Sequence, residues 1–199
     1  MKMVLSSDNA GKLREFRDIF ADTGIELLSK KDCGCSIEVE ETGTSYQENA
    51  YLKAVAVTEA TGEIAVADDS GLMVAALDGA PGVHSARFTG SHEDTDEQRY
   101  LYLLEKLDGV ADRRAKFVSC ICCTFPNGDV LRARGECHGE IALEMSGTGG
   151  FGYDPVFLPK DCGGASMASI SQEKKNEIAH RGRAIRAFKE ELKKYYADK

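Results

Sequence analysis

Two adjacent carboxylates, Asp68 and Asp69, directly follow the apolar run from Ile64 to Ala67. Two acids at the end of a buried strand repel each other unless a cation or strong hydrogen-bond donors compensate their charge. Glu41 adds a third acid, just before a predicted helix. Carboxylate oxygens are ligands that Mg²⁺ prefers, and Mg²⁺ takes further ligands from water and substrate phosphates. These acids therefore predict a magnesium site, with the alternative that Asp68 and Asp69 only cap a turn at Ser70 and Gly71.

A polar segment near the N-terminus could bind an anion. It contains Ser7, Asp8, Asn9, Ala10, Gly11 and Lys12 and lies between a predicted strand and a predicted helix. Backbone N–H groups at a helix N-terminus attract anions, and a lysine beside them strengthens the attraction. It is not a Walker A loop, because Leu13 stands where that motif has Ser or Thr. The alternative is a polar capped turn with a solvated lysine.

Basic residues gather near the C-terminus, at Lys174, Lys175, His180, Arg181 and Arg183. A charged run on a terminal helix is usually only its solvated face. His180 and Arg181 could instead direct hydrogen-bond donors at a ligand. Arginine only donates, so it suits a phosphate or a keto oxygen.

Periodicity and capping signals indicate the elements that position these residues. We expect a strand over residues 2–6 and a helix whose face carries Leu13, Phe16, Ile19 and Phe20. Ser45-x-x-Glu48 predicts a capped helix that ends at Gly62. A strand over residues 64–67 should then end at the two acids.

Further along the chain, Thr95-x-x-Gln98 predicts a second capped helix, with Leu101, Leu104 and Leu107 on its buried face. Asn127-Gly128 predicts a hairpin between strands at residues 116–125 and 130–136. Residues 147–155 should form a loop, followed by a strand at 156–158. We expect one long helix from about Ser171, with a buried stripe of Ile178, Ile185 and Leu192. The pattern predicts one α/β domain with a mixed sheet.

The composition excludes some partners. Among 199 residues, Asp and Glu exceed Lys and Arg by 33 to 25, which leaves a net charge of −8. Nonspecific binding to nucleic acid or an anionic membrane then lacks its electrostatic driving force. The seven cysteines lack paired C-x-x-C spacing, so we expect reduced thiols and no zinc site. No signal peptide or apolar run of about 18 residues is evident, which predicts a cytoplasmic protein.

Six segments together resemble the inosine triphosphate pyrophosphatases, also called the noncanonical purine nucleoside triphosphate pyrophosphatases or Ham1 proteins. They are S-x-N-x-G-K at 7–12, E-T-G-x-S-Y-x-E-N-A at 41–50, A-D-D-S-G-L at 67–72, A-P-G-V-x-S-A-R at 80–87, G-F-G-Y-D-P-V-F at 150–157 and K-N-x-I-x-H-R-G at 175–182. Each motif alone is weak, but all six occur in order along the whole chain.

The resemblance implies Mg²⁺-dependent hydrolysis of ITP, dITP and XTP to the monophosphate and pyrophosphate. It also implies a homodimer and a fold of two lobes, with a mixed, strongly twisted sheet, flanking helices and a central nucleotide cleft. Glu41 and Asp69 would ligate magnesium, and Asp69, with Lys12 and Asp68, would be catalytic. The implied substrate-binding residues are Ser7, Asp8, Asn9, Ala10, Gly11, Lys12, Ser70, Arg87, Phe151, Gly152, Tyr153, Asp154, Lys175, His180 and Arg181.

Hydrogen bonding also favours a 6-keto purine as the base of the substrate. Donors from His180 and Arg181 would match its keto oxygen, whereas adenine has an amino group at that position and would be mispaired. Phe151 or Tyr153 could stack on the base or merely pack the fold. The sequence departs from the family at Ser169, where an acid is common. Two other functions stay open: a Maf-like pyrophosphatase acting on dTTP, UTP or modified nucleotides, and a nucleotide sensor without turnover.

Overall fold

The computed structural model describes residues 1–91 and 93–197. Its sheet has the strand order β2-β1-β3-β4-β5-β6. β1 pairs in parallel with β2 and β3, whereas β5 and β6 are antiparallel, so the predicted mixed α/β sheet is confirmed. The strands are β1 (Lys2–Leu5), β2 (Glu26–Ser29), β3 (Ala65–Val74), β4 (Arg114–Thr124), β5 (Val130–Ile141) and β6 (Phe157–Pro159).

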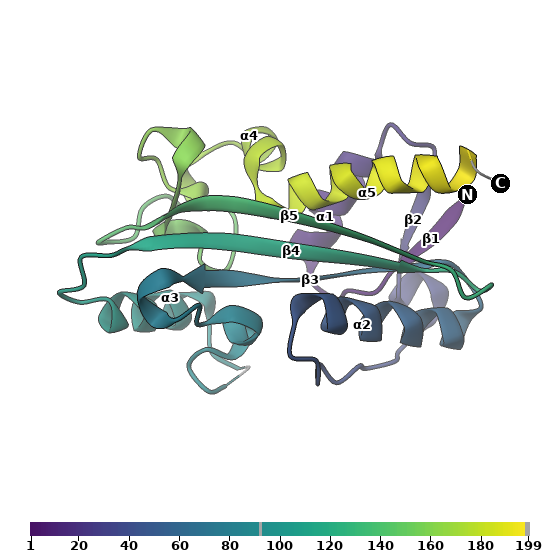
Figure 1. The fold of residues 1–199 in the computed structure, drawn as a ribbon, viewed down its shortest axis with the longest axis horizontal. Coiled ribbons are helices and arrows are strands. Elements are labelled where there is room, and N and C mark those ends of the chain that lie inside the picture. Colours follow the sequence, from purple (N-terminus) through teal and green to yellow (C-terminus); the bar gives the residue numbers. More distant parts are fainter. Residues whose placement is uncertain (92, 198–199) are drawn as a thin grey trace. The chain divides into compact units, whose positions relative to one another are not determined.

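The α-helices of the described residues fall between and after these strands (Figure 1). They are α1 (Ala10–Phe20), α2 (Tyr46–Thr61), α3 (Asp96–Lys106), α4 (Gln172–Ile178) and α5 (His180–Ala197). None of them is both long enough and apolar enough to cross a membrane.

The chain divides into two compact units, each with its own apolar core. Unit 1 comprises Met1–Asp69, Ser119–Gly135 and Arg181–Lys199, and unit 2 comprises Ser70–Val118 and Glu136–His180. The prediction that the chain folds as a single domain of two lobes stays a prediction. Each predicted site residue is therefore described within its own unit.

In unit 1 the helices cover both faces of the sheet. Val66 of β3 packs with Phe16 of α1 and Ile185 of α5, whereas the next residue, Ala67, packs with Ala50 of α2. Figure 1 shows α2 on one side of the strands and α1 and α5 on the other. Successive side chains of a strand point to opposite faces. The same alternation directs Asp68 toward α1 and α5, and Asp69 toward α2.

β3 is longer than the sequence predicted. It runs to Val74, so Asp68 and Asp69 lie inside a strand, and the expectations that they end a strand or cap a turn at Ser70 and Gly71 are wrong. The register explains the difference. β1 pairs with β3 only as far as Leu5 opposite Val66, while β4 is hydrogen-bonded along the other edge of β3. Asp68 and Asp69 therefore come after the last β3 residue that pairs with β1, although β3 itself continues beside β4.

The capped helices form largely as expected. Ser45 caps α2 by accepting a hydrogen bond from Glu48 N, and the helix ends at Gly62 in the left-handed conformation. Glu48 completes no reciprocal box there, because its carboxylate accepts hydrogen bonds from Thr44 instead. In α3 the capping box of Thr95 and Gln98 is complete.

The buried face of α3 differs from the prediction. Leu101 is 49% exposed, whereas Tyr100, Leu103 and Leu107 are buried. The three buried residues share the core of unit 2 with Phe157. Spacings of three and four residues starting from Tyr100 define this face, so the prediction that Leu101 is buried is wrong.

The predicted C-terminal helix is also interrupted. α4 ends at Ile178, Ala179 is extended with ψ of 156°, and α5 begins at His180. Ala179 is buried in the core of unit 2, and Ile185 is buried in the core of unit 1. The expected hairpin of β4 and β5 is present, and its turn contains a hydrogen bond from Phe125 N to Asp129 O.

Candidate active site

Asp68 is held by two cations of unit 1. Arg181 Nε donates to Asp68 Oδ2 over 2.9 Å, and Lys12 Nζ lies 3.2 Å from Asp68 Oδ1. Arg181 Nη1 also donates to Oε2 of Glu15 on α1 over 2.5 Å. The side chains of Asp68, Arg181 and Glu15 are almost completely buried. One guanidinium thus joins carboxylates from α1 and β3 next to the N-terminal turn.

Asp69 meets a different set of partners, all on or before α2. Lys53 Nζ lies 3.1 Å from Asp69 Oδ1 and 2.8 Å from Glu41 Oε1. Asn49 Nδ2 donates to Asp69 Oδ2 over 3.3 Å. Asn49 and Lys53 are four residues apart and therefore share one face of α2. The two neighbouring acids of β3 consequently have different direct partners.

These surroundings shift the pKa values of the two acids in opposite directions. Burial alone would raise the pKa of Asp68, but Lys12 and Arg181 outweigh it and lower that pKa strongly. Burial raises the pKa of Asp69 above its ordinary value, despite the opposing attraction of Lys53. Asp68 is therefore held as an anion, and Asp69 has the higher proton affinity of the two.

The N-terminal turn borders a cavity of about 420 Å³ in unit 1, lined by Ser6, Ser7, Asp8, Asn9, Lys12, Lys30, Glu38, Val39, Glu41, Lys53 and Asp68. Asn9 caps α1, because its side chain accepts a hydrogen bond from Lys12 N. Burial lowers the pKa of Lys12 despite the attraction of Asp68. An anion in the cavity would favour the charged form of this lysine, so the cavity suits a polyphosphate.

The donor set is compatible with magnesium. Glu41 and Asp69 supply hard oxygen atoms, and the Lys53 ammonium between them shows that the pair attracts a cation. Among residues 1–91 and 93–197, no group of three or more His, Cys, Asp or Glu side chains is arranged to hold a metal ion. Two carboxylates, with water and substrate oxygens as the other ligands, match the coordination that Mg²⁺ commonly has.

The predicted substrate residues near the C-terminus form a second group, in unit 2. Lys175 Nζ donates to Asp154 Oδ2 over 2.7 Å, and both side chains are buried. Asp154 Oδ2 also accepts a hydrogen bond from Phe151 N, and the Lys175 ammonium lies 4.4 Å from the centre of the Phe151 ring. Gly152 N donates to Asp96 Oδ2. Asp154 thus organises the loop that presents Phe151.

The two aromatic residues of this loop differ in exposure. Tyr153 is buried in the core of unit 2 and its hydroxyl donates to Ser85 O, so it packs the fold. Phe151 is half-buried and is the better candidate for stacking on a base.

The remaining predicted residues are placed as follows. The His180 ring stacks on Phe117, with ring centres 4.7 Å apart. Arg87 Nε donates to His84 Nδ1, and Ser70 is half-buried in β3. Ser70, Arg87 and His180 belong to unit 2, whereas Arg181 belongs to unit 1.

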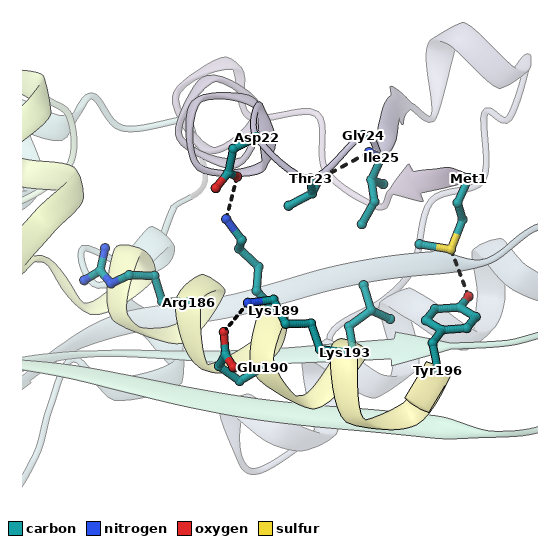
Figure 2. A pocket seen from close by; sticks show the side chains of 11 residues that line it. Met1, Asp22, Thr23, Gly24, Ile25, Arg186, Lys189, Glu190, Lys193 and Tyr196 are labelled. Carbon is teal, nitrogen blue, oxygen red and sulfur yellow. Dashed lines mark hydrogen bonds and ion pairs between the residues drawn. The ribbon is translucent and has the colours of Figure 1, made fainter. Parts of the chain in front are cut away.

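A larger cavity of about 850 Å³ lies elsewhere in unit 1, between the end of α1 and α5 (Figure 2). Its lysines are matched by acids: Lys189 lies 2.6 Å from Asp22 Oδ1, and Lys193 lies 2.7 Å from Glu190 Oε1. Figure 2 shows both pairs as dashed lines among the residues that line the cavity. None of the acids or lysines assigned to the candidate site lines this cavity.

Sequence reasoning missed Glu15, Lys30, Asn49 and Lys53. The signal for Asn49 and Lys53 was available, because they are polar residues on the face of α2 that also carries Ala50 and Ala54. Lys30 gave no comparable signal; its ammonium lies 2.7 Å from Asp8 Oδ2.

Comparison with known proteins gives consistent matches over nearly the whole chain. The model of the Ham1 family matches residues 3–191. A protein of Synechococcus sp. (strain CC9311) named dITP/XTP pyrophosphatase is 46% identical over 193 residues, which cover 96% of this chain and 90% of that protein. A protein of the same name from Desulforamulus reducens is 43% identical, with 98% of each chain covered.

Solved structures match as well. The Ham1 protein of Staphylococcus aureus has a TM-score of 0.87 at 38% identity and covers 98% of this chain and 100% of its own. A HAM1 protein of Coxiella burnetii also has a TM-score of 0.87, at 36% identity over all of both chains.

Proposed function

The chain belongs to the Ham1 family, and we propose that it hydrolyses dITP, ITP and XTP to the nucleoside monophosphate and pyrophosphate in a Mg²⁺-dependent reaction. Its curated relatives named dITP/XTP pyrophosphatase support this substrate class. The observation that carries the proposal is that Lys12, Glu41 and Lys53 line one cavity of unit 1, and that Lys53 joins Glu41 to Asp69.

The triphosphate is assigned to the cavity beside the N-terminal turn. Lys12 and Lys30 line that cavity and attract phosphate oxygens. The backbone N–H groups of Ala10 and Gly11 lie in the first turn of α1, where N–H groups have no acceptor within the helix. They would donate hydrogen bonds to the same oxygens.

Asp69 is the proposed proton acceptor. It would take a proton from water as the water oxygen bonds to the α-phosphorus, and the bond from that phosphorus to the bridging oxygen would break with release of pyrophosphate. Asn49 and Lys53 hold the two Asp69 oxygens and so fix its orientation. Arg181 and Glu15 keep Asp68 in place beside Lys12.

Glu41 and Asp69 would hold the magnesium ion. When bound, Mg²⁺ would neutralise negative charge on the reacting phosphates. Roles for Phe151, Lys175 and His180 in recognising the base stay predictions, as do a homodimer and a cytoplasmic location. We assign Arg181 to the positioning of Asp68 rather than to the base, because its carboxylate partners are buried with it.

The test is a panel of nucleotides assayed for pyrophosphate and for free phosphate. We expect rapid pyrophosphate release from dITP, ITP and XTP, slow release from dATP and GTP, and none after chelation of divalent ions. Preference for dTTP or UTP would favour the Maf-like alternative. Nucleotide binding without any release would favour a sensor.

A further inference from the structure

Lys53 occupies the position that a bound cation would take. Its ammonium bridges Glu41 Oε1 and Asp69 Oδ1 over 2.8 and 3.1 Å. The Lys53 side chain is only 13% exposed, and the Asp69 side chain is 9% exposed. The bridge is thus an internal ion pair of unit 1 at the two carboxylates assigned to magnesium.

Two other cations of unit 1 contact the neighbouring carboxylates Asp68 and Glu15. Arg181 contacts Glu15 and Asp68, and Lys12 contacts Asp68. Lys53 contacts Glu41 and Asp69 together and so balances part of their negative charge. A divalent ion bound to the same oxygens would be repelled by the ammonium, because like charges at such short range disfavour each other.

The Lys53 ammonium could move from the carboxylates to the neighbouring cavity. Lys53 lines the 420 Å³ cavity together with Lys12 and Lys30. Its flexible four-carbon side chain allows the ammonium to turn from the carboxylates toward an anion in that cavity. A polyphosphate there would stabilise the new position by a charge-assisted hydrogen bond.

We propose that Lys53 is an exchangeable counter-ion of Glu41 and Asp69. When a polyphosphate binds, the Lys53 ammonium moves to the polyphosphate, and a divalent ion replaces it at the two carboxylates. This inference rests on the proposed function, since it assumes the metal site at Glu41 and Asp69. Metal and nucleotide then bind with positive coupling, and the coupling factor is the same in both directions. The free protein is thereby protected from holding metal without substrate.

The experiment measures Mn²⁺ binding to the full-length protein by electron paramagnetic resonance, with Mn²⁺ as the probe for Mg²⁺. Titrations are made with and without the α,β-methylene analogue of ITP, which resists cleavage. We compare the unsubstituted protein with Lys53→Met, Lys53→Gln and Lys53→Arg. Lys30→Met is the matched control, because Lys30 lines the same cavity and is similarly buried but pairs with Asp8.

Without the analogue, we expect Lys53→Met and Lys53→Gln to bind Mn²⁺ about 10-fold more tightly than the unsubstituted protein, within the usual range of coupling. Lys53→Arg, which keeps the charge, should bind weakly, and Lys30→Met should change affinity far less. The analogue should tighten Mn²⁺ binding to the unsubstituted protein and have a much smaller effect in Lys53→Met.

Equal or weaker Mn²⁺ binding by both Lys53→Met and Lys53→Gln, in the absence of the analogue, would overturn the inference. Glu41→Gln separates this failure from failure of the proposed function. If Glu41→Gln abolishes Mn²⁺ binding in the presence of the analogue, the metal site stands and only the counter-ion role is rejected. If Glu41→Gln leaves that binding unchanged, the metal assignment itself is rejected, and the inference falls with it.

Discussion

Arg181 on α5 donates a hydrogen bond over 2.9 Å to Asp68 on β3, and both side chains are buried. The same guanidinium donates to Glu15 on α1, so one cation fixes two carboxylates from different elements. Asp68 is in turn placed beside Lys12, at the edge of the proposed phosphate cavity. This buried triad links the stability of unit 1 to the position of Lys12.

The first prediction concerns this triad. Arg181→Met should lower the free energy of unfolding by about 3–5 kcal/mol, because it leaves Asp68 and Glu15 as buried charges without their shared partner. Urea denaturation at neutral pH measures the effect. Arg17→Met is the control, since the Arg17–Asp32 pair is exposed and should contribute about 0–1 kcal/mol. Similar losses in both variants would contradict a stabilising role for the triad.

The sequence located the two acids of β3 but not their surroundings. The apolar run before Asp68 predicted a buried strand, yet nothing in the pattern reveals that β1 stops pairing at Leu5 while β3 continues beside β4. Because β3 continues through both acids, Asp68 and Asp69 lie on opposite faces of one strand. Their mutual repulsion, which first suggested a metal site, is relieved mainly by separate cations.

The break between α4 and α5 shows a second limit. Residues 171–197 contain no proline, and their one glycine, Gly182, lies after the break at Ala179. Local propensity therefore gives no reason to interrupt the helix. Burial of Ala179 in one core and Ile185 in another is a tertiary effect, which overrides the continuous helical pattern. Lys175 and Arg181 consequently belong to different units.

The second prediction is that Asp69→Asn lowers kcat for dITP by about 10²- to 10⁴-fold, the usual contribution of a general base. Folding should be largely spared, because burial already raises the pKa of Asp69 and the amide oxygen of the new side chain can still accept one of the two hydrogen bonds that Asp69 accepts from Asn49 and Lys53. Asp22→Asn provides a control at an exposed acid away from the candidate site. Pyrophosphate release and circular dichroism are measured together. Retention of most activity by Asp69→Asn would reject its role as the base.

The third prediction concerns the thiols, which form no disulfide among the described residues. Cys120, Cys122, Cys123 and Cys137 are buried in strands, and burial raises the pKa of Cys122 to about 11. Thiolates are the reactive species, so these four thiols should resist alkylation in the folded protein. Mass spectrometry after iodoacetamide treatment should find label first at Cys33, Cys35 and Cys162, which are half-buried. Full labelling in urea is the control, and early labelling of a strand thiol would contradict the burial described.

The last prediction compares two glycines of the loop that presents Phe151. Gly150 and Gly152 both have positive φ, so alanine strains each backbone by about 1–2 kcal/mol. A Cβ at Gly150 would also collide with the Asp154 carboxylate, whereas a Cβ at Gly152 meets nothing within 4 Å. Because Asp154 holds Lys175 in a buried ion pair, Gly150→Ala should lose about 3–5 kcal/mol more than Gly152→Ala.

Urea denaturation of both variants measures this difference, and the KM for dITP tests its functional consequence. If Lys175 and Phe151 bind substrate, Gly150→Ala should raise KM well above the value for Gly152→Ala, because displacement of Asp154 releases both residues from their places. Lys160→Ala, at an exposed residue of the same unit, controls for nonspecific effects. Equal KM values in the two glycine variants, together with unequal stabilities, would show that the Asp154–Lys175 pair stabilises the fold but does not contribute to substrate binding.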